Sequence, residues 1–281
     1  MRHTAVMSIG RALARACHPV PTVAVTGFIL ALAWALGWPA ARLVGLAVVV
    51  LIGQLSVGWS NDAHDADLDR VSARLDKPAA TGQVRTGVLW VLAAIMLAGS
   101  VVGSWWVAGW LGGTFHIVAL VAAWAYNLGL SRTVWSGAAY LVAFGCVPAF
   151  LAYGLDGQPP ARWLVLVAAM IGLSGHLANA GGDIQADAEA GQGGLAVRLG
   201  ARSSFTLCWT VLAFACTLLA AAGFTGQGWA GPVGAVVVLA GFVAGLTWSK
   251  VSGRPRDPFH AVLAVTAVDL LALIWVVRSG A

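Results

Sequence analysis

The chain has 281 residues, of which 59% are hydrophobic and only 10% are charged, and its formal net charge is +5. Soluble domains are about 45–50% apolar and about 25% charged. The composition therefore excludes an ordinary soluble protein and predicts an all-α integral membrane protein. The modest positive charge forms no basic run, which argues against a nucleic-acid partner. The four cysteines form no CxxC pair, so neither a disulfide framework nor a zinc site is expected.

Apolar runs long enough to cross a bilayer, roughly 17–25 residues, occur nine times along the chain. The first run follows Arg11 and Arg15 as in a signal peptide, but many further runs come after it, so we interpret it as a retained membrane helix. Gly, Pro and charged residues separate the runs, and many Trp lie near the run ends, as in an interfacial aromatic belt. The predicted spans cover residues 21–38, 42–60, 87–106, 109–127, 136–154, 162–180, 204–223, 230–248 and 260–278, within one domain over 1–281.

The basic residues predict the orientation of these spans. If the N-terminus is cytoplasmic, all 16 Lys and Arg residues fall on the cytoplasmic side except Arg42, Arg162 and Arg278. Cytoplasmic loops of membrane proteins carry such an excess of Lys and Arg. We therefore expect an integral protein of a bacterial or archaeal cell membrane, with its N-terminus in the cytoplasm.

The acidic residues gather in two loops that are both cytoplasmic in this arrangement. Five of the 11 acidic residues fall in SNDAHDADLDRVSARLDKP after the second span, and three more follow the sixth span. On a continuous helix, residues spaced i, i+4 and i+8 share one face, where like charges repel unless a cation neutralises them. The first loop has this spacing at Asn61, Asp65 and Asp69, with Asp62 three residues before Asp65, and the second has it at Asn179, Asp183 and Asp187.

Basic residues follow both acidic clusters, and the combination predicts a diphosphate site. Carboxylate and amide oxygens suit Mg²⁺ or Ca²⁺, and Mg²⁺ usually binds a few carboxylates together with substrate phosphate oxygens. Metals and bases also stabilise charge on a departing diphosphate. A site at the cytoplasmic mouth of a membrane bundle suits a substrate with a polar head and a long apolar tail. The bases are Arg70, Arg74 and Lys77 after the first cluster and Arg198 and Arg202 after the second.

Three other interpretations of the acidic loops are open. The loops could be solvated charged faces, although the rest of the chain avoids acids. The segment DADLDRVSARLD resembles an EF-hand calcium loop, but it has Arg70 where that loop needs Gly and Asp76 where it has Glu. Carboxylates beside membrane helices also bind the cations that transporters carry, so an ion or metabolite transporter is a third possibility.

The two motifs resemble those of the UbiA superfamily of intramembrane prenyltransferases. The NDxxDxxxD motif of that family matches residues 61–69, and Arg70, Lys77-Pro78 and Gly82 follow as in many members. The second family motif is similar to NAGGDIQADAEAGQGGLAVRLG, residues 179–200. The resemblance covers essentially the whole chain.

This resemblance implies nine transmembrane helices around a central cavity, with both Asp motifs at its cytoplasmic mouth. It also implies Mg²⁺-dependent ionisation of a prenyl diphosphate and capture of the allylic cation by an aromatic or lipid acceptor. Members often carry a Tyr that is followed shortly by a Lys. In this sequence the Tyr is Tyr126, and Arg132 would replace the Lys. The implied catalytic residues and metal ligands are Asp62, Asp65, Asp69, Asp183 and Asp187. The implied diphosphate contacts are Asn61, Arg70, Lys77, Tyr126, Arg132 and Asn179.

Two other activities of this chemistry stay open. Some members of the superfamily are terpene cyclases, which ionise a prenyl diphosphate without an external acceptor. A related reaction is phosphoribosyl transfer to a polyprenyl phosphate, which also expels diphosphate.

Two polar residues inside predicted spans each allow two interpretations. Asp269 lies within the ninth span, where an acid is either functional or bonded inside the bundle. His176 lies one turn before Asn179, so it is either a packing residue or a neighbour of the second motif.

Overall fold

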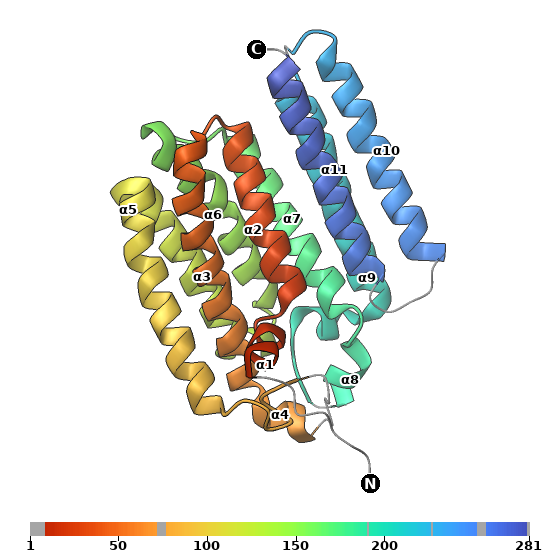
Figure 1. Ribbon diagram of the computed structural model, residues 1–281. Helices are drawn as coiled ribbons and strands as arrows, with labels where there is room; N and C mark the ends of the chain where they lie inside the picture. The colour runs from red at the N-terminus through yellow and green to blue at the C-terminus, as the bar shows by residue number, and fades with distance from the viewer. Residues whose placement is uncertain (1–8, 72–76, 190, 226, 252–256, 280–281) are drawn as a thin grey trace.

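The computed structural model describes residues 9–71, 77–189, 191–225, 227–251 and 257–279, and the regular structure within these ranges is helical (Figure 1). Helices are expected because lipid leaves backbone N–H and C=O groups no partner outside their own segment. The helices are α1 (Ile9–Ala16), α2 (Pro19–Ala35), α3 (Ala40–His64), α4 (Ala66–Val71), α5 (Thr86–Asn127), the 3₁₀ turn η1 (Leu130–Arg132), α6 (Ser136–Asp156), α7 (Arg162–Ala180), α8 (Ile184–Glu189), α9 (Leu195–Leu218), the π-turn η2 (Leu219–Gly223), α10 (Ala230–Val251) and α11 (Asp257–Ser279).

Each predicted span falls largely on a helix. Among the described residues, seven helices are long and apolar enough to cross a membrane, and the pair α1 and α2, bent by 62°, would add an eighth. The first span ends earlier than predicted because α2 stops at Ala35, Gly37 adopts a φ of 94°, and Pro39 precedes α3. The prediction of an all-helical membrane protein is confirmed, whereas the number of crossings and the central cavity stay predictions.

Helix α5 holds two predicted spans, 87–106 and 109–127, because it folds back on itself at Gly109. This residue has φ 65° and ψ −176°, a conformation that is essentially restricted to glycine. Trp90 near the start of α5 and Trp124 near its end have ring centroids only 6.1 Å apart. The two arms of α5 therefore run antiparallel.

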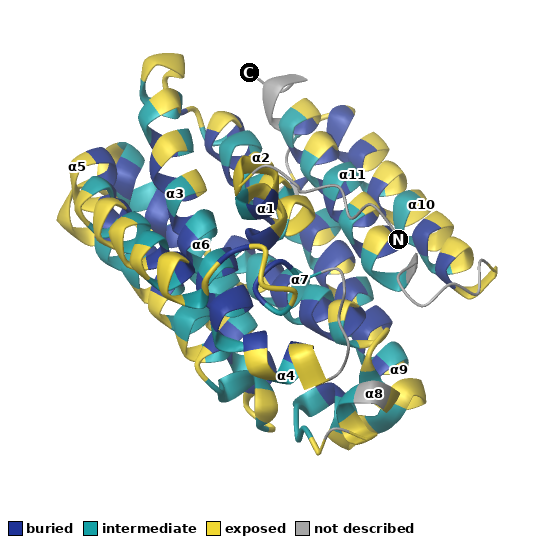
Figure 2. Ribbon diagram, turned by 60° about the horizontal axis from the view of Figure 1, so that its bottom comes forward, coloured by how far each residue is buried: buried dark blue, intermediate teal, exposed yellow. Residues whose placement is uncertain are grey.

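Helices that follow one another in the chain pack side by side, and the last helix packs against α2 near the start of the chain. α3 packs against α2 and α5, α6 packs against α5 and α7, and α11 packs against α10, α7 and α2. Figure 1 shows α9, α10 and α11 as a group on one side, with α10 outermost. In Figure 2 the exposed residues lie mainly on outward faces, including those of α5 and α10, which are the faces available to lipid.

Glycines bring α5 and α6 close together. A Cβ atom on Gly112 would lie 2.9 Å from the Phe150 carbonyl oxygen, and one on Gly154 would lie 2.7 Å from the Ala108 Cβ. Membrane helices pack through such small residues because lipid gives no hydrophobic drive to their association. The second arm of α5, which ends at Tyr126 and Asn127, is thereby held against α6.

Arg42 joins three segments at the end of the bundle opposite α4. Its guanidinium donates hydrogen bonds to the carbonyl oxygens of Val107 at 2.9 Å, Gly154 at 2.6 Å and Leu155 at 3.4 Å. Its Cζ lies 4.4 Å from the centroid of the Trp38 ring. Carbonyl groups at helix ends lack hydrogen-bond donors within the helix. Arg42 therefore provides donors for carbonyl groups both at the bend of α5 and at the end of α6.

Arg42→Met is expected to lower the free energy of unfolding by about 1.5–3 kcal/mol, the usual contribution of hydrogen bonds to a charged group. The measurement is thermal unfolding in detergent, followed by the intrinsic fluorescence of the 14 Trp residues. The matched control is Arg162→Met, at an exposed position at the start of α7, with an expected effect of at most about 0.5 kcal/mol. Equal effects of the two substitutions would contradict this role of Arg42.

Candidate active site

The first acidic motif lies at the junction of α3 and α4. α3 continues past its predicted end to His64, and a separate helix begins at Ala66, so the motif is not one continuous helix. Asn61 Nδ2 donates to Asp65 Oδ2 at 3.1 Å, and the Asp69 N–H donates to the Asp65 carbonyl oxygen at 2.8 Å. The spacing of four residues thus brings Asn61 and Asp65 into contact, while the short α4 carries Asp69.

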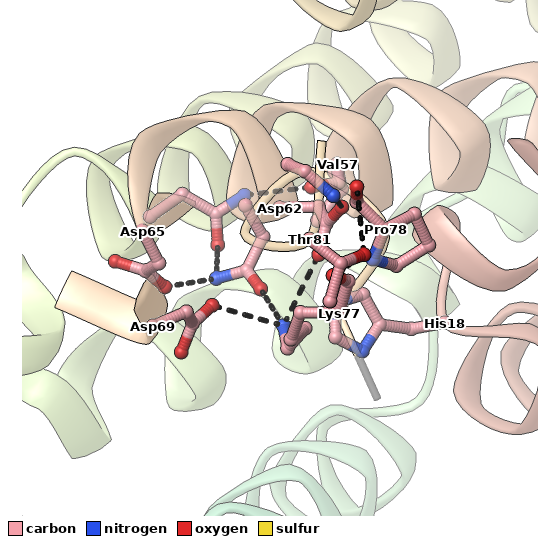
Figure 3. Close-up of polar contacts among 11 residues, drawn as sticks. His18, Val57, Asp62, Asp65, Asp69, Lys77, Pro78 and Thr81 are labelled. Carbon is pink, nitrogen blue, oxygen red and sulfur yellow. Dashed lines mark hydrogen bonds and ion pairs between the residues drawn. The ribbon is translucent and has the colours of Figure 1, made fainter. Parts of the chain in front are cut away.

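The ammonium group of Lys77 lies among the side chains of this motif (Figure 3). Its Nζ is 3.6 Å from Asp62 Oδ1 and 3.8 Å from Asp69 Oδ2, and it donates to Asn61 Oδ1 at 3.5 Å. His18 Nε2, at the break between α1 and α2, lies 3.1 Å from the same Nζ. The Lys77 side chain is only 11% exposed, and opposite charges attract more strongly where water is excluded. Lys77 therefore holds the motif together.

Asp62 is the most deeply buried carboxylate of the motif, with a fully buried side chain. Its Oδ2 accepts a hydrogen bond from the Ala79 N–H at 3.1 Å. Its Oδ1 accepts none and faces Lys77. A buried charge is costly unless it is paired, so Asp62 both fixes the segment that follows Lys77 and requires a cation beside it.

Arg132 on η1 connects the first motif to the loop of the second. Its Nη2 donates to Asp65 Oδ1 at 3.1 Å. The backbone of η1 also lies against that loop, since a Cβ on Gly193 would be 3.0 Å from the Arg132 carbonyl oxygen and one on Gly194 would be 2.7 Å from that of Ser131. The two glycines permit this close approach.

Asn127, at the end of α5, is a residue of the site that the sequence did not single out. It is 5% exposed, and its Nδ2 donates to the Val57 carbonyl oxygen at 2.8 Å and to Ser60 Oγ at 2.9 Å. Its Oδ1 accepts a hydrogen bond from Asn61 Nδ2 at 3.5 Å. Asn127 therefore orients Asn61, and its position at the end of an apolar span beside Tyr126 was the available signal.

The second acidic motif lies around the turn between α7 and α8. α7 ends at Ala180, so this motif also leaves the helix rather than extending it. Asn179 and Asp183 are exposed, whereas Asp187 is half-buried, and its N–H donates to the Asp183 carbonyl oxygen at 2.8 Å. Figures 1 and 2 show α8 at the same end of the bundle as α1 and α4.

Tyr126, at the end of α5, lies beside the second motif. Tyr126 and Asp187 line a pocket of about 60 Å³ together with Ser136 and His176. Residues of α5, α6, α7 and α8 thus meet at one polar pocket, and Arg132 links the neighbouring η1 to Asp65 of the first motif.

The donor chemistry of the first motif fits Mg²⁺. Its ligands would be carboxylate oxygens, which are hard donors. One of them is the buried Asp62 Oδ1, which now has the positive charge of Lys77 beside it. In the described part of the chain, no group of three or more His, Cys, Asp or Glu side chains is placed to hold a metal ion as it stands. Lys77 and Arg132 lie at carboxylate oxygens of Asp62 and Asp65 that a metal ion would use.

Arg70 lies outside this cluster. It donates to Asp67 Oδ1 at 2.6 Å, and the two side chains are 57% and 94% exposed, respectively. Exposed ion pairs contribute little to stability, so the pair serves at most to hold α4. Arg74 and Asp76, which the sequence placed in the same stretch, lie outside the described residues.

The two polar residues inside predicted spans have different surroundings. Asp269 is 2% exposed, and its Oδ2 accepts a hydrogen bond from Cys216 Sγ at 3.3 Å. Its Oδ1, in contrast, is buried without a hydrogen-bond partner, so the choice between the two alternatives stays a prediction. Cys216 is a free cysteine like the other three. His176 does approach the second motif, because it lines the same pocket as Asp187.

Comparisons with known proteins agree with the fold. The model of the UbiA prenyltransferase family matches residues 20–273. A UbiA homolog from Archaeoglobus fulgidus, solved with GPP and Mg²⁺, has a TM-score of 0.74 at 15% identity, covering 95% of this chain and 99% of that one. The apo UbiA homolog from Aeropyrum pernix K1 has a TM-score of 0.70 at 18% identity, covering 96% and 98%. At these identities the solved structures establish the fold.

A curated relative adds a partial match. Protoheme IX farnesyltransferase from Nocardia farcinica (strain IFM 10152) is 32% identical over 109 residues, which is 36% of this chain. The match spans only 33% of that relative's length. The family match, in contrast, extends over most of the sequence and confirms the resemblance drawn from the two Asp motifs. The chain belongs to the UbiA prenyltransferase family.

Proposed function

We propose that this protein is a Mg²⁺-dependent prenyltransferase that ionises a prenyl diphosphate and transfers the prenyl group to an aromatic or lipid acceptor. One observation carries the proposal: η1 lies between the two motifs, because Arg132 donates to Asp65 Oδ1 in the first motif while the η1 backbone lies against Gly193 and Gly194 in the loop of the second. Cationic Lys77 and Arg132 border the same site. Acids that attract Mg²⁺ beside bases that attract phosphate are what a diphosphate headgroup requires.

The solved relatives support the choice of donor. Homologs from Archaeoglobus fulgidus were solved with GPP and Mg²⁺ and with DMAPP and Mg²⁺. The farnesyltransferase relative suggests protoheme IX as one acceptor to test. The membrane-spanning bundle provides an apolar environment for the prenyl tail, and we propose nine crossings around a central cavity, with the N-terminus and both motifs in the cytoplasm of a bacterial or archaeal cell.

Each site residue has a proposed task. When bound, Mg²⁺ would neutralise charge that develops on the departing diphosphate. Lys77 and Arg132 would bind phosphate oxygens after leaving their carboxylate partners, Asn61 would be oriented by Asn127, and Arg70 would order α4 through Asp67. Tyr126 and Asn179 would contact the diphosphate from the second side of the site. The proposed metal ligands are Asp62, Asp65, Asp69, Asp183 and Asp187.

The test is an assay of the purified protein with geranyl, farnesyl and geranylgeranyl diphosphate, in Mg²⁺ or in EDTA. The acceptor panel contains 4-hydroxybenzoate, protoheme IX and a total lipid extract, and released diphosphate and prenylated products are measured by mass spectrometry. The proposal predicts Mg²⁺-dependent release of diphosphate together with a prenylated acceptor. Absence of diphosphate release with every donor would refute it.

The other activities considered from the sequence give different results in the same experiment. A terpene cyclase would release diphosphate and a hydrocarbon or terpene alcohol without any acceptor. Phosphoribosyl transfer would require phosphoribosyl diphosphate and a polyprenyl phosphate. A transporter would move solute into liposomes and release no diphosphate.

A further inference from the structure

His176 lines the pocket that borders the second motif, and one of its ring nitrogens is buried without a partner. The residue is 2% exposed, and its Nδ1 has no hydrogen-bond partner. Its other nitrogen, Nε2, lies 3.0 Å from Ser136 Oγ. Buried polar atoms in proteins nearly always have partners, so an orphaned nitrogen beside a pocket indicates a group that binds something there.

The orientation of the His176 ring is fixed by three other helices. Ser136 Oγ accepts a hydrogen bond from the Leu195 N–H at 3.0 Å, which ties the start of α6 to the start of α9. The rings of Tyr126 and Tyr140 flank the imidazole, with centroids 5.7 Å and 4.9 Å from it. A ring held on this many sides has a fixed orientation.

The hydrogen bond with Ser136 is compatible with a basic Nδ1. A neutral imidazole has one nitrogen that donates and one that accepts. When the Nε2–H donates to Ser136 Oγ, the lone pair is on Nδ1, where it can take a proton. This resembles the way in which a general base is oriented by a neighbouring group.

Prenyl transfer releases a proton that some group must accept. The C–O bond of the donor breaks, and its electron pair leaves with the diphosphate. A new bond then forms between the prenyl carbon and the acceptor, and the acceptor loses a hydrogen as H⁺. Asp187, the charged residue that lines the pocket, is already a proposed metal ligand and is poorly suited to this task.

We propose that His176, oriented by Ser136, accepts this proton, and that the pocket receives the protic edge of the acceptor, such as a phenolic hydroxyl. A volume of about 60 Å³ has room for such an edge or for a water or two, but not for a whole aromatic acceptor. The proposal rests on the proposed function, and it adds a catalytic residue that neither acidic motif contains.

The experiment compares His176→Asn and His176→Gln with the wild-type protein, using the donor and acceptor that give the most product in the panel above. Both side chains keep hydrogen-bonding groups but cannot take a proton. We expect kcat for transfer to fall about 10²-fold or more, the usual share of a general base. The KM for geranyl diphosphate and its affinity in Mg²⁺, measured by titration calorimetry, are expected to stay within about twofold, since His176 serves the acceptor.

The pH profile provides a second readout. In the wild type, log kcat is expected to rise with pH with unit slope and then level off, as the base loses its own proton. Both substitutions should abolish this rise of log kcat with pH, which is the acid limb of the profile. The control is His260→Gln, at an exposed position in α11, which should leave the profile unchanged. Thermal unfolding of each variant verifies that it is folded.

Three results would overturn the proposal. One is full transfer activity in both variants, which would assign the proton to the diphosphate or to another group. Another is a loss of donor affinity parallel to the loss of kcat, which would make His176 a packing residue. The last is an unchanged acid limb in the variants. Absence of any transfer by the wild-type protein would instead refute the proposed function itself.

Discussion

Asp65→Asn is expected to lower kcat/KM for prenyl transfer by about 10²–10³-fold, while the protein remains folded. Asp65 contacts both Asn61 and Arg132 at the centre of the site. The substitution removes a negative charge with almost no change in shape, and loss of one preorganised electrostatic group typically has an effect of this size. Initial rates at saturating Mg²⁺ and thermal unfolding of the same preparation measure the two quantities.

Asp67→Asn is the matched control for this prediction. Asp67 belongs to the same stretch, but its side chain is 94% exposed and pairs only with Arg70 among the contacts described above. Its substitution is expected to change kcat/KM by less than about twofold, as for most surface positions. Similar losses in both variants would show that activity depends on the total charge of the loop and not on the position of Asp65.

Lys77→Met is expected to destabilise the protein by about 3–5 kcal/mol in EDTA, because breaking a buried ion pair leaves an uncompensated charge. The Asp62 side chain has no exposure to water, and Asp69 has little. Added Mg²⁺ should raise the melting temperature of the variant more than that of the wild type, since the ion no longer competes with an ammonium group. Thermal unfolding across a Mg²⁺ titration measures the difference.

The control for Lys77 is Lys250→Met, at the exposed end of α10. This substitution removes the same charge from the chain and should leave the response to Mg²⁺ unchanged. If Lys77→Met and wild type respond equally to Mg²⁺, then Lys77 does not compete with the metal for these carboxylates. Calcium in place of Mg²⁺ would show whether the response is specific to the smaller ion.

The sequence predicted the helices well because long apolar runs in lipid have few alternatives to a helix. It also separated the two arms of α5, since the glycines around Gly109 interrupt the apolar pattern. It predicted two helix ends less well. α2 ends at a turn after Ala35, and α3 continues beyond its apolar part through polar residues to His64. These ends depend on local backbone geometry that hydropathy does not record.

The site was predictable only in part. The acidic residues carry a strong spacing signal, and Asn61 and Asp65, which were expected on one helix face, are in contact. The expected continuous helix through Asp69 is wrong, because α3 ends at His64 and α4 begins at Ala66. The position of Lys77 beneath Asp62 and Asp69 is a tertiary contact, as is the pairing of Ser136 with His176 across 40 positions. No periodicity reveals such contacts, because they arise only when separate helices meet. The assignment of metal ligands and diphosphate contacts stays a prediction.

The glycine seam between α5 and α6, formed by Gly112 and Gly154, explains why these helices contact each other rather than lipid. Acyl chains are as apolar as the side chains that face them, so hydrophobicity alone does not favour contact with another helix over contact with lipid. At Gly112 and Gly154 the helices approach so closely that a Cβ atom on either glycine would clash with the other helix, and dispersion attraction depends on such close contact. The shape of the seam, rather than its polarity, therefore selects α6 as the partner of the arm that carries Tyr126 into the site.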